Sequence, residues 1–245
     1  MQPTRAYGKL IAMNRYAALM AAATMLAMPV AHAAEPVKRV AVYVLPYYES
    51  ARDAGGTPTI AVAKAYDALL ASKRTEDVVR ARDEIAKNNA LLTPMTLMVL
   101  AIRLYDVGLR DDAVFWFYAA KDRFVTLAGV ADVRAPQLAQ VEDAVRNFAV
   151  LAGPVINGYA FCDVANQQRQ QTKALQWTID NPYQAIFLPQ VPALPGDRKQ
   201  NLARAIAELK ASIAKERDHL AQPANVAQLQ EQRAKNGADR KYCWS

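Results

Sequence analysis

Histidine is scarce in this sequence, and its scarcity excludes several classes of active site. The chain has two histidines, His32 and His219. A metal site built from a histidine cluster is therefore excluded, and any Ser-His-Asp or Cys-His centre would have to use His219. His219 follows Arg217-Asp218 on a strongly charged segment, which is typical of a solvated surface side chain.

Other signatures of chemistry are missing from the sequence as well. It contains no glycine-rich phosphate loop, nucleophile elbow or zinc-ligand spacing. We therefore expect no cofactor and no metal, and the sequence favours a protein that is not an enzyme. Glycan hydrolysis needs only two carboxylates across a cleft, so adjacent acidic residues leave that route open. These pairs are Glu76-Asp77, Asp83-Glu84, Asp111-Asp112 and Glu142-Asp143.

Acidic residues are absent from the beginning of the chain, before Glu35. Basic residues there precede an Ala/Leu/Met-rich run, Tyr16 to Val30, which ends in Ala31-His32-Ala33. Positive charge, a short apolar run and a small-residue cleavage site predict a secretory signal peptide, residues 1–33, cut after Ala33. The run is shorter than the roughly 20 residues that span a bilayer. An uncleaved anchor or a buried N-terminal helix is the alternative, and either Met1 or Met13 can be the translation start.

Basic and acidic residues are nearly balanced in number once this leader is removed. The leader holds three of the 30 basic residues and none of the 23 acidic ones, so the formal charge falls from +7 to +4. Without a Lys/Arg block, this mild excess argues against a nucleic-acid partner. No later segment reaches membrane-spanning length, so we expect no membrane span after cleavage. The remaining residues, 34–245, are expected to form one periplasmic or secreted domain.

Cysteine is limited to Cys162 and Cys243. An even number of cysteines in an oxidising compartment predicts a disulfide between them. That bond would close a loop of roughly eighty residues, worth about 4–5 kcal/mol in the chain-entropy model. It would attach the polar tail, residues 236–242, to the helix that carries Cys162.

The pattern of apolar residues predicts a mainly all-α fold. Alternation over residues 37–45 indicates a short strand or an extended arm, and Thr57-Pro58 is a helix-start signal that opens a core of helical hairpins at residues 57–180. Four prolines mark residues 181–197 as a loop. Residues 198–245 then contain the C-terminal helices and tail. The expected architecture is a compact multi-helix domain of stacked helical hairpins.

One predicted helix, Met95 to Val107, has only three polar residues, so most of its surface is expected to be buried. Two of them, Arg103 and Asp106, are three residues apart on one stripe. We expect them to pair with each other or with a neighbour, or to line a small polar pocket. Gly108 ends this helix, and Asp111-Asp112 opens the next one.

This helix pair has small, turn and aromatic residues at the positions where one kind of helical repeat usually places them. They are Leu100-Ala101, Gly108, Ala113, Trp116-Phe117 and Ala119-Ala120. The pair, about residues 95–124, resembles a tetratricopeptide-type unit, and specifically the related Sel-like repeat. That resemblance implies helices that approach closely and a fold that binds other proteins. It also implies a role as an immunity or inhibitor protein against a secreted toxin, since Sel-like repeat proteins are found in that role.

The sequence therefore predicts an exported protein–protein interaction module whose partner is another protein. Trp177, Tyr183 and Phe187 are candidate aromatic anchors for the partner, with the alternative that they belong to the core of the last helices. Two other functions stay open, a cell-envelope hydrolase that uses paired carboxylates and a structural envelope protein.

Overall fold

The computed structural model describes residues 35–40, 44, 47–52 and 58–244. Internal contacts divide the chain into two units, Met1–Ala33 and Ala34–Ser245, and every described residue belongs to the second. The predicted signal peptide, residues 1–33, lies outside the described residues. The described part is mainly helical, as predicted, and contains one two-stranded sheet.

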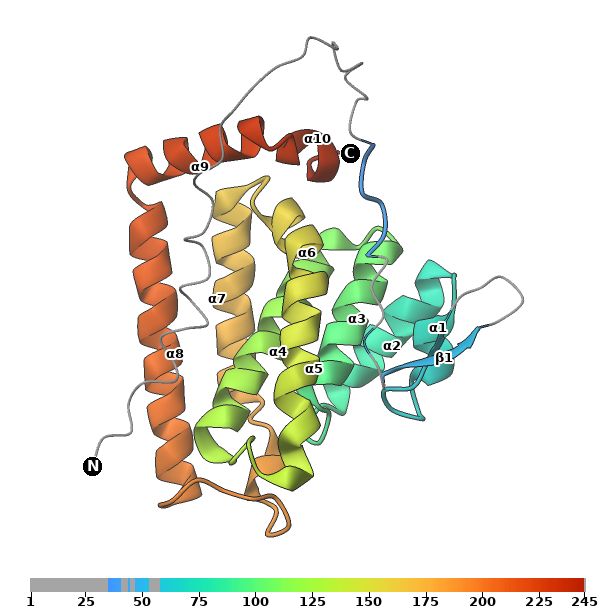
Figure 1. Cartoon of the computed structure of the whole chain (residues 1–245), viewed down its shortest axis with the longest axis vertical. Coiled ribbons are helices and arrows are strands. Elements are labelled where there is room, and N and C mark those ends of the chain that lie inside the picture. Colours follow the sequence, from blue (N-terminus) through green and yellow to red (C-terminus); the bar gives the residue numbers. More distant parts are fainter. Residues whose placement is uncertain (1–34, 41–43, 45–46, 53–57, 245) are drawn as a thin grey trace, which may run out of the picture. The chain divides into compact units, whose positions relative to one another are not determined.

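Ten α-helices and two short 3-10 helices make up most of the described chain (Figure 1). The first five α-helices are α1 (Asp67–Ala71), α2 (Thr75–Lys87), α3 (Pro94–Asp106), α4 (Arg110–Val130) and α5 (Ala139–Leu151). The remaining five are α6 (Gly153–Ala160), α7 (Val164–Asp180), α8 (Arg198–Leu220), α9 (Pro223–Lys235) and α10 (Ala238–Tyr242). The 3-10 helices are η2 (Pro136–Leu138) and η3 (Gln184–Phe187).

Several helix boundaries lie where local sequence signals place them. Thr93 caps α3, because its side-chain oxygen accepts a hydrogen bond from the backbone N–H of Thr96 at 3.1 Å. Gly108 takes the left-handed conformation, φ +89°, in the turn between α3 and α4. Asp197 caps α8 by accepting from the N–H of Gln200 at 2.9 Å. These local contacts confirm the predicted α3–α4 pair and the predicted start of the C-terminal helices at residue 198.

The predicted helix start at Thr57-Pro58 is wrong. Pro58–Ile60 instead forms strand β2, which pairs antiparallel with β1 (Tyr48–Arg52). Proline is tolerated as the first residue of a strand, so this signal does not require a helix. The helix begins later, where the Asp67 carboxylate accepts from two backbone N–H groups, each at 2.9 Å. Of the arm predicted at 37–45, residues 37–40 and Val44 are described, and none of them is in a strand.

The prediction that Cys162 lies within a helix is also wrong, because the chain forms two helices here, α6 and α7. The chain leaves helical geometry at Phe161-Cys162 and re-enters it at Asp163. Asp163 caps α7 by accepting from the N–H of Asn166 at 2.9 Å. The break places Cys162 on an exposed connection between α6 and α7.

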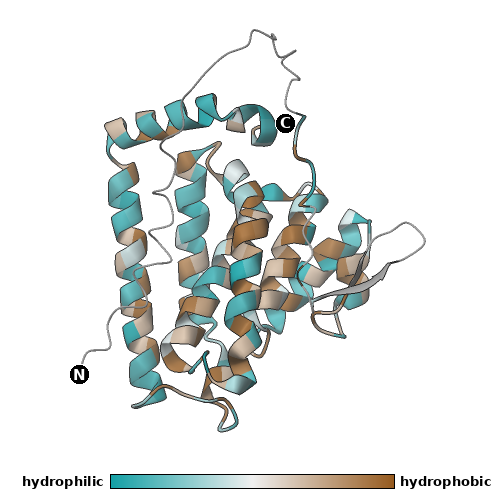
Figure 2. Ribbon diagram, in the orientation of Figure 1, coloured by the Kyte–Doolittle hydropathy of each residue, from teal (hydrophilic) through white to brown (hydrophobic). Residues whose placement is uncertain are grey.

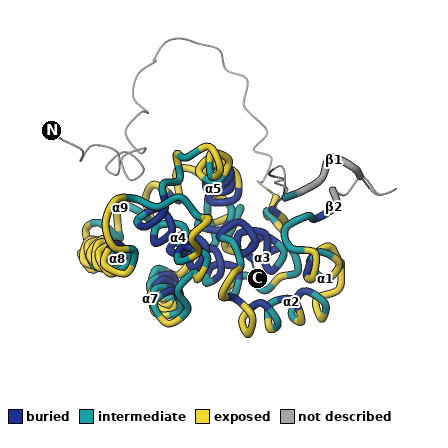
Figure 3. The backbone as a smooth tube through the Cα atoms, turned by 90° about the horizontal axis from the view of Figure 1, so that it is seen from below, coloured by how far each residue is buried: buried dark blue, intermediate teal, exposed yellow. Residues whose placement is uncertain are grey.

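The core of the described chain is centred on α3 and α4, which pack side by side. Figure 3 shows both helices mainly as buried tube, whereas the outward sides of α2 and α8 are exposed. Figure 2 gives the reason, since apolar residues gather on α3 and α4 and polar residues on α8 and α9. A Cβ on Gly129 would stand 2.4 Å from the Ala205 Cβ, so glycine is what allows α4 and α8 to approach this closely.

Candidate functional site

Arg103 and Asp106 form the ion pair that their spacing predicts, with 2.5 Å between Arg103 Nη1 and Asp106 Oδ2. Arg103 also donates to the backbone oxygens of Leu70 and Ser72 at 2.7 and 2.9 Å. The second Asp106 oxygen accepts from the N–H of Val40 at 2.7 Å. Burial raises the pKa of the Asp106 carboxyl, and Arg103 partly opposes that shift. The pair attaches the N-terminal arm and the end of α1 to α3.

Arg123 on α4 is a charged residue in the core of the described chain, and the sequence did not identify it. Its side chain is 0% exposed. It donates to Asn89 O at 2.7 Å, Leu92 O at 2.9 Å, Asn89 Oδ1 at 3.1 Å and Asn181 O at 3.0 Å. Burial lowers the pKa of Arg123 to about 10. The guanidinium thus joins the α2–α3 connection to the end of α7.

Aromatic rings surround this guanidinium. Its central carbon lies 4.7 Å from the Trp177 ring centre and 5.6 Å from that of Tyr183. Trp177 also packs edge-on against Trp116, with ring centres 5.1 Å apart. Phe187 packs against a second small core cluster around Ile186. The structure therefore brings Trp177 and Tyr183 together around Arg123, whereas Phe187 packs with Tyr183 against the cluster that contains Ile186. All three side chains are half-buried.

The proline-rich loop, residues 181–197, is held at many points. Leu194 N donates to Val130 O at 2.9 Å, and Asp132 N donates to Pro192 O at 3.0 Å. Arg198 donates to the backbone oxygens of Ile186 and Val191 from its two terminal nitrogens. Between these anchors the segment Leu188-Pro189-Gln190 is exposed. The loop is therefore a fixed backbone that presents a short apolar turn.

The predicted acid pairs lie mostly on solvated faces or at helix starts. Asp77 pairs with Arg80, Asp112 with Arg82, and Asp143 with Arg146. The most buried acid of the described chain is Asp122 on α4, which is 6% exposed and which the sequence did not single out.

Burial raises the pKa of Asp122 to about 7, and its Oδ2 has no hydrogen-bond partner among the described residues. Glu216 on α8 adds to that shift and accepts hydrogen bonds from Gln167 and Gln171 of α7 at 3.2 and 3.0 Å. Gln167 also donates to the Tyr118 hydroxyl at 3.1 Å, and burial raises the pKa of Tyr118. Polar groups therefore join α4, α7 and α8 behind the exposed face of α8.

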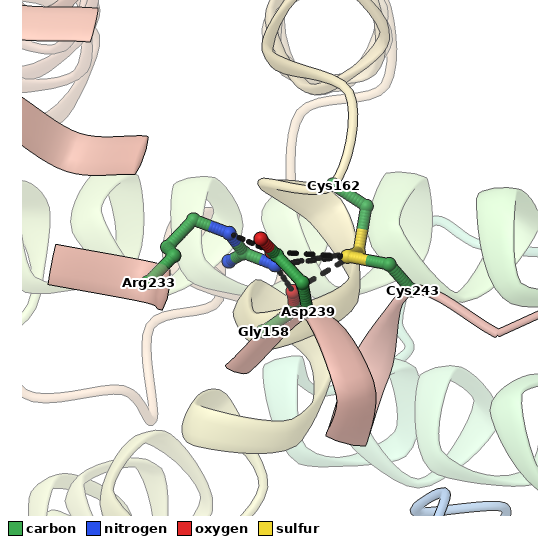
Figure 4. Close-up of polar contacts among 5 residues, drawn as sticks. All are labelled: Gly158, Cys162, Arg233, Asp239 and Cys243. Carbon is green, nitrogen blue, oxygen red and sulfur yellow. Dashed lines mark hydrogen bonds and ion pairs between the residues drawn. A yellow bond between two sulfur atoms is a disulfide. The ribbon is translucent and has the colours of Figure 1, made fainter. Parts of the chain in front are cut away.

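The predicted disulfide is present. Cys162 and Cys243 are bonded, with 5.5 Å between their Cα atoms, and close a loop with a sequence separation of 81. Arg233 of α9 points into this bond (Figure 4) and is 9% exposed. It donates to Cys243 Sγ at 3.0 Å, Cys162 Sγ at 3.4 Å and Gly158 O at 3.0 Å, and its Nε donates to Asp239 Oδ1 at 2.8 Å.

The tail beyond α9 is attached to the N-terminal arm as well as to α6. Val37 N donates to Lys241 O at 2.8 Å. The Arg110 guanidinium lies over the rings of Trp244 and Tyr159, at 4.0 and 4.6 Å from their centres, and donates to Trp244 O at 2.7 Å. We call the disulfide, α10 and Trp244 the C-terminal clasp. It holds together both ends of the described chain.

His219, the metal sites and the membrane spans considered from the sequence can be compared with the described residues. His219 is exposed near the end of α8, where its ring faces the Asn225 side chain at 3.1 Å. The described residues contain no group of three or more His, Cys, Asp or Glu side chains placed to hold a metal ion. Among these same residues, no helix combines the length and the apolar character needed to cross a membrane.

Comparison with known proteins places the chain in a family. No protein-family model matches it, and no solved structure matches it. A protein of Haemophilus influenzae, described as uncharacterised, is 34% identical over 210 residues, which cover 86% of this chain and 81% of the relative. The chain belongs to the same family as that protein. The description of the relative names no activity.

Proposed function

We propose that this protein is exported and acts in the periplasm or outside the cell as a module that binds another protein. The observation that carries the proposal is the loop at residues 181–197. Its backbone is hydrogen-bonded at both ends and its Ile186 is buried, yet Leu188 is 44% exposed. A loop fixed in advance loses little conformational freedom on binding, so its exposed apolar residues can contribute fully to affinity.

A second exposed apolar residue belongs to the neighbouring segment. Leu91, in the α2–α3 connection, is 61% exposed, the largest exposure among the large apolar side chains of the described chain. Gln184 N donates to Ala90 O at 2.8 Å, so the connection and the start of η3 are in direct contact. Leu91 and Leu188 therefore belong to two segments that are fixed against each other. We call these segments, residues 88–93 and 181–197, the loop surface.

The loop surface replaces part of the surface first proposed from the sequence. The rings of Trp177 and Tyr183 pack against the Arg123 guanidinium inside the fold, so they stabilise the loop instead of facing a partner. Phe187 is partly accessible beside Leu188 in the chain. The aromatic residues thus contribute to recognition mainly by fixing the loop.

Export is supported by the disulfide together with the leader sequence. Cys162 and Cys243 are exposed, and an exposed structural disulfide is kept in oxidising compartments and is rare in a reducing cytosol. Within the class of exported binding proteins, the finer proposal is an inhibitor or immunity protein of a secreted toxin. It rests on the likeness of the α3–α4 hairpin to a Sel-like repeat.

Site-specific photo-crosslinking in intact cells of the native host tests the binding proposal. A photoreactive amino acid at position 188 is compared with the same probe at Lys210, an exposed residue of α8. The proposal expects a discrete crosslinked product from position 188 that is weakened by Leu91→Asp and is absent at position 210. Identical products from both positions, or none from position 188, would contradict it.

A further inference from the structure

The C-terminal clasp contains a feature that a purely structural disulfide does not need. Both cysteines are exposed, so an attacking thiol can reach the bond from solvent. A buried cation, Arg233, meets the same bond from the protein side and donates to both sulfurs. The closer contact, 3.0 Å, is to Cys243 Sγ.

The hydrogen bonds from Arg233 stabilise the reduced protein more than the oxidised one. A disulfide sulfur is a weak acceptor, whereas a thiolate next to an arginine is strongly stabilised and has a lowered pKa. Asp239 Oδ1 lies 3.4 Å from Cys243 Sγ, and a disulfide sulfur has no hydrogen to share with it. The Cys243 thiol formed by reduction would supply that hydrogen. Arg233 therefore favours the release of Cys243 as a thiolate, and Asp239 accepts a hydrogen bond from Cys243 only after that thiolate has taken up a proton.

We propose that the Cys162–Cys243 bond is a thiol-exchange site, with Cys162 as the sulfur that is attacked and Cys243 as the leaving group. An external thiolate forms a bond to Cys162 Sγ while the bond between the two cysteine sulfurs breaks. The electron pair of that bond remains on Cys243, which leaves as a thiolate next to Arg233. A second external thiol then resolves the mixed disulfide, so two external thiols are oxidised to one disulfide and Cys162 and Cys243 are reduced.

Opening the bond has a structural consequence, because it releases the elements that the clasp holds. The ring of Tyr242 lies directly against Gly158, where an added Cβ would stand 2.5 Å from it. Loss of the Cys162 anchor frees this contact, the Trp244 contact to Arg110, and the Lys241 contact to Val37. Thiol exchange thus controls whether the tail and the N-terminal arm stay together.

The rate of reduction tests the proposal on the full mature protein. Oxidised protein is mixed with excess reduced glutathione or, in a second arm, with a reduced dithiol protein of the thioredoxin type. Free thiols are alkylated at intervals and counted by mass spectrometry. The proposal expects Arg233→Met to slow reduction by about fivefold, because Cys243 becomes a poorer leaving group. Arg233→Lys, which keeps the charge, should recover part of the rate.

Arg240→Met is the matched control. Arg240 is an exposed residue of α10 near Cys243, and the described hydrogen bonds include none from Arg240 to either sulfur, so its replacement removes the same charge without removing a sulfur contact. It should change the rate by less than about twofold, as expected for a screened surface charge. If Arg233 only holds α10 in place, Arg233→Met loosens the clasp and speeds reduction. A faster or unchanged rate would therefore overturn the proposal.

Trapping the mixed disulfide provides a second test. Early quenching and peptide mapping should find glutathione on Cys162, with Cys243 alkylated. Glutathione mainly on Cys243 would contradict the assignment of the leaving group. A much faster reaction in the dithiol-protein arm than with glutathione, at equal thiolate concentration, would identify a protein thiol as the preferred source.

Discussion

Replacing Arg123 by methionine should destabilise this protein strongly, because the guanidinium serves backbone oxygens that have no other donor among the described residues. Those oxygens are Leu92 O and Asn181 O, whereas Asn89 O also accepts from the N–H of Leu92. A buried acceptor without a partner costs roughly 1–3 kcal/mol, which gives roughly 2–6 kcal/mol for two. Removing a desolvated charge offsets part of this cost. We expect a net loss of about 3 kcal/mol.

Urea unfolding at pH 7 measures this change, with far-UV circular dichroism and tryptophan fluorescence as independent probes. For a chain of this size, the loss corresponds to a fall in Tm of about 6–12 °C. Arg123→Lys should recover only part of it, since an ammonium group lacks the planar set of five donors. The control is Arg146→Met, which removes an exposed ion pair with Asp143 and should cost no more than about 0.5 kcal/mol. Equal effects of Arg123→Met and Arg146→Met would refute the central role of Arg123.

Three other changes probe separate parts of the structure. Gly129→Ala should destabilise by about 1–3 kcal/mol through its clash with Ala205, and a double-mutant cycle with Ala205→Gly should show recovery; additive effects would contradict a direct contact. Asp122 has a pKa of about 7 in the folded state, above the roughly 3.9 of an unfolded carboxyl. Asp122 therefore contributes stability at low pH, where it is protonated, and this contribution is lost as the pH rises through 7. Asp122→Asn should be more stable than the wild type at pH 8, and its unfolding free energy should depend less on pH between 5 and 8. An unchanged pH dependence would contradict the raised pKa. Replacing both Cys162 and Cys243 by serine should cost up to about 4–5 kcal/mol and expose the bonds after Arg240 and Lys241 to trypsin, whereas a tail that stays resistant would show that the clasp does not depend on the disulfide.

The parts of the fold that sequence could predict depend on contacts between near neighbours. The start of α3 follows from the Thr93 side chain and the N–H three residues on, and the turn that follows needs only the left-handed Gly108. The ion pair of Arg103 and Asp106 is likewise set by their spacing along one helix. The Cys162–Cys243 bond followed from counting, since two cysteines allow one pairing.

The parts that sequence could not predict depend on contacts across the fold. Lys121-Asp122-Arg123 has the composition of a solvated helical turn, yet Asp122 and Arg123 are buried because α7, α8 and the loop surface cover them. Arg233 likewise lies on a polar helix, and only the return of Cys243 to Cys162 shows what it contacts. The signal for Asp163 was available, since aspartate is a preferred N-cap residue, and it would have placed a helix boundary next to Cys162.

Intact-mass analysis of the protein from its native host most directly tests whether it is exported and closed by a disulfide. Cells are opened in the presence of an alkylating agent, and the protein is analysed before and after reduction. An exported protein should begin at Ala34 and gain two alkyl groups only after reduction. A chain that begins at Met1 or Met13 and carries two alkyl groups without reduction would contradict both the export proposal and the role of the C-terminal clasp.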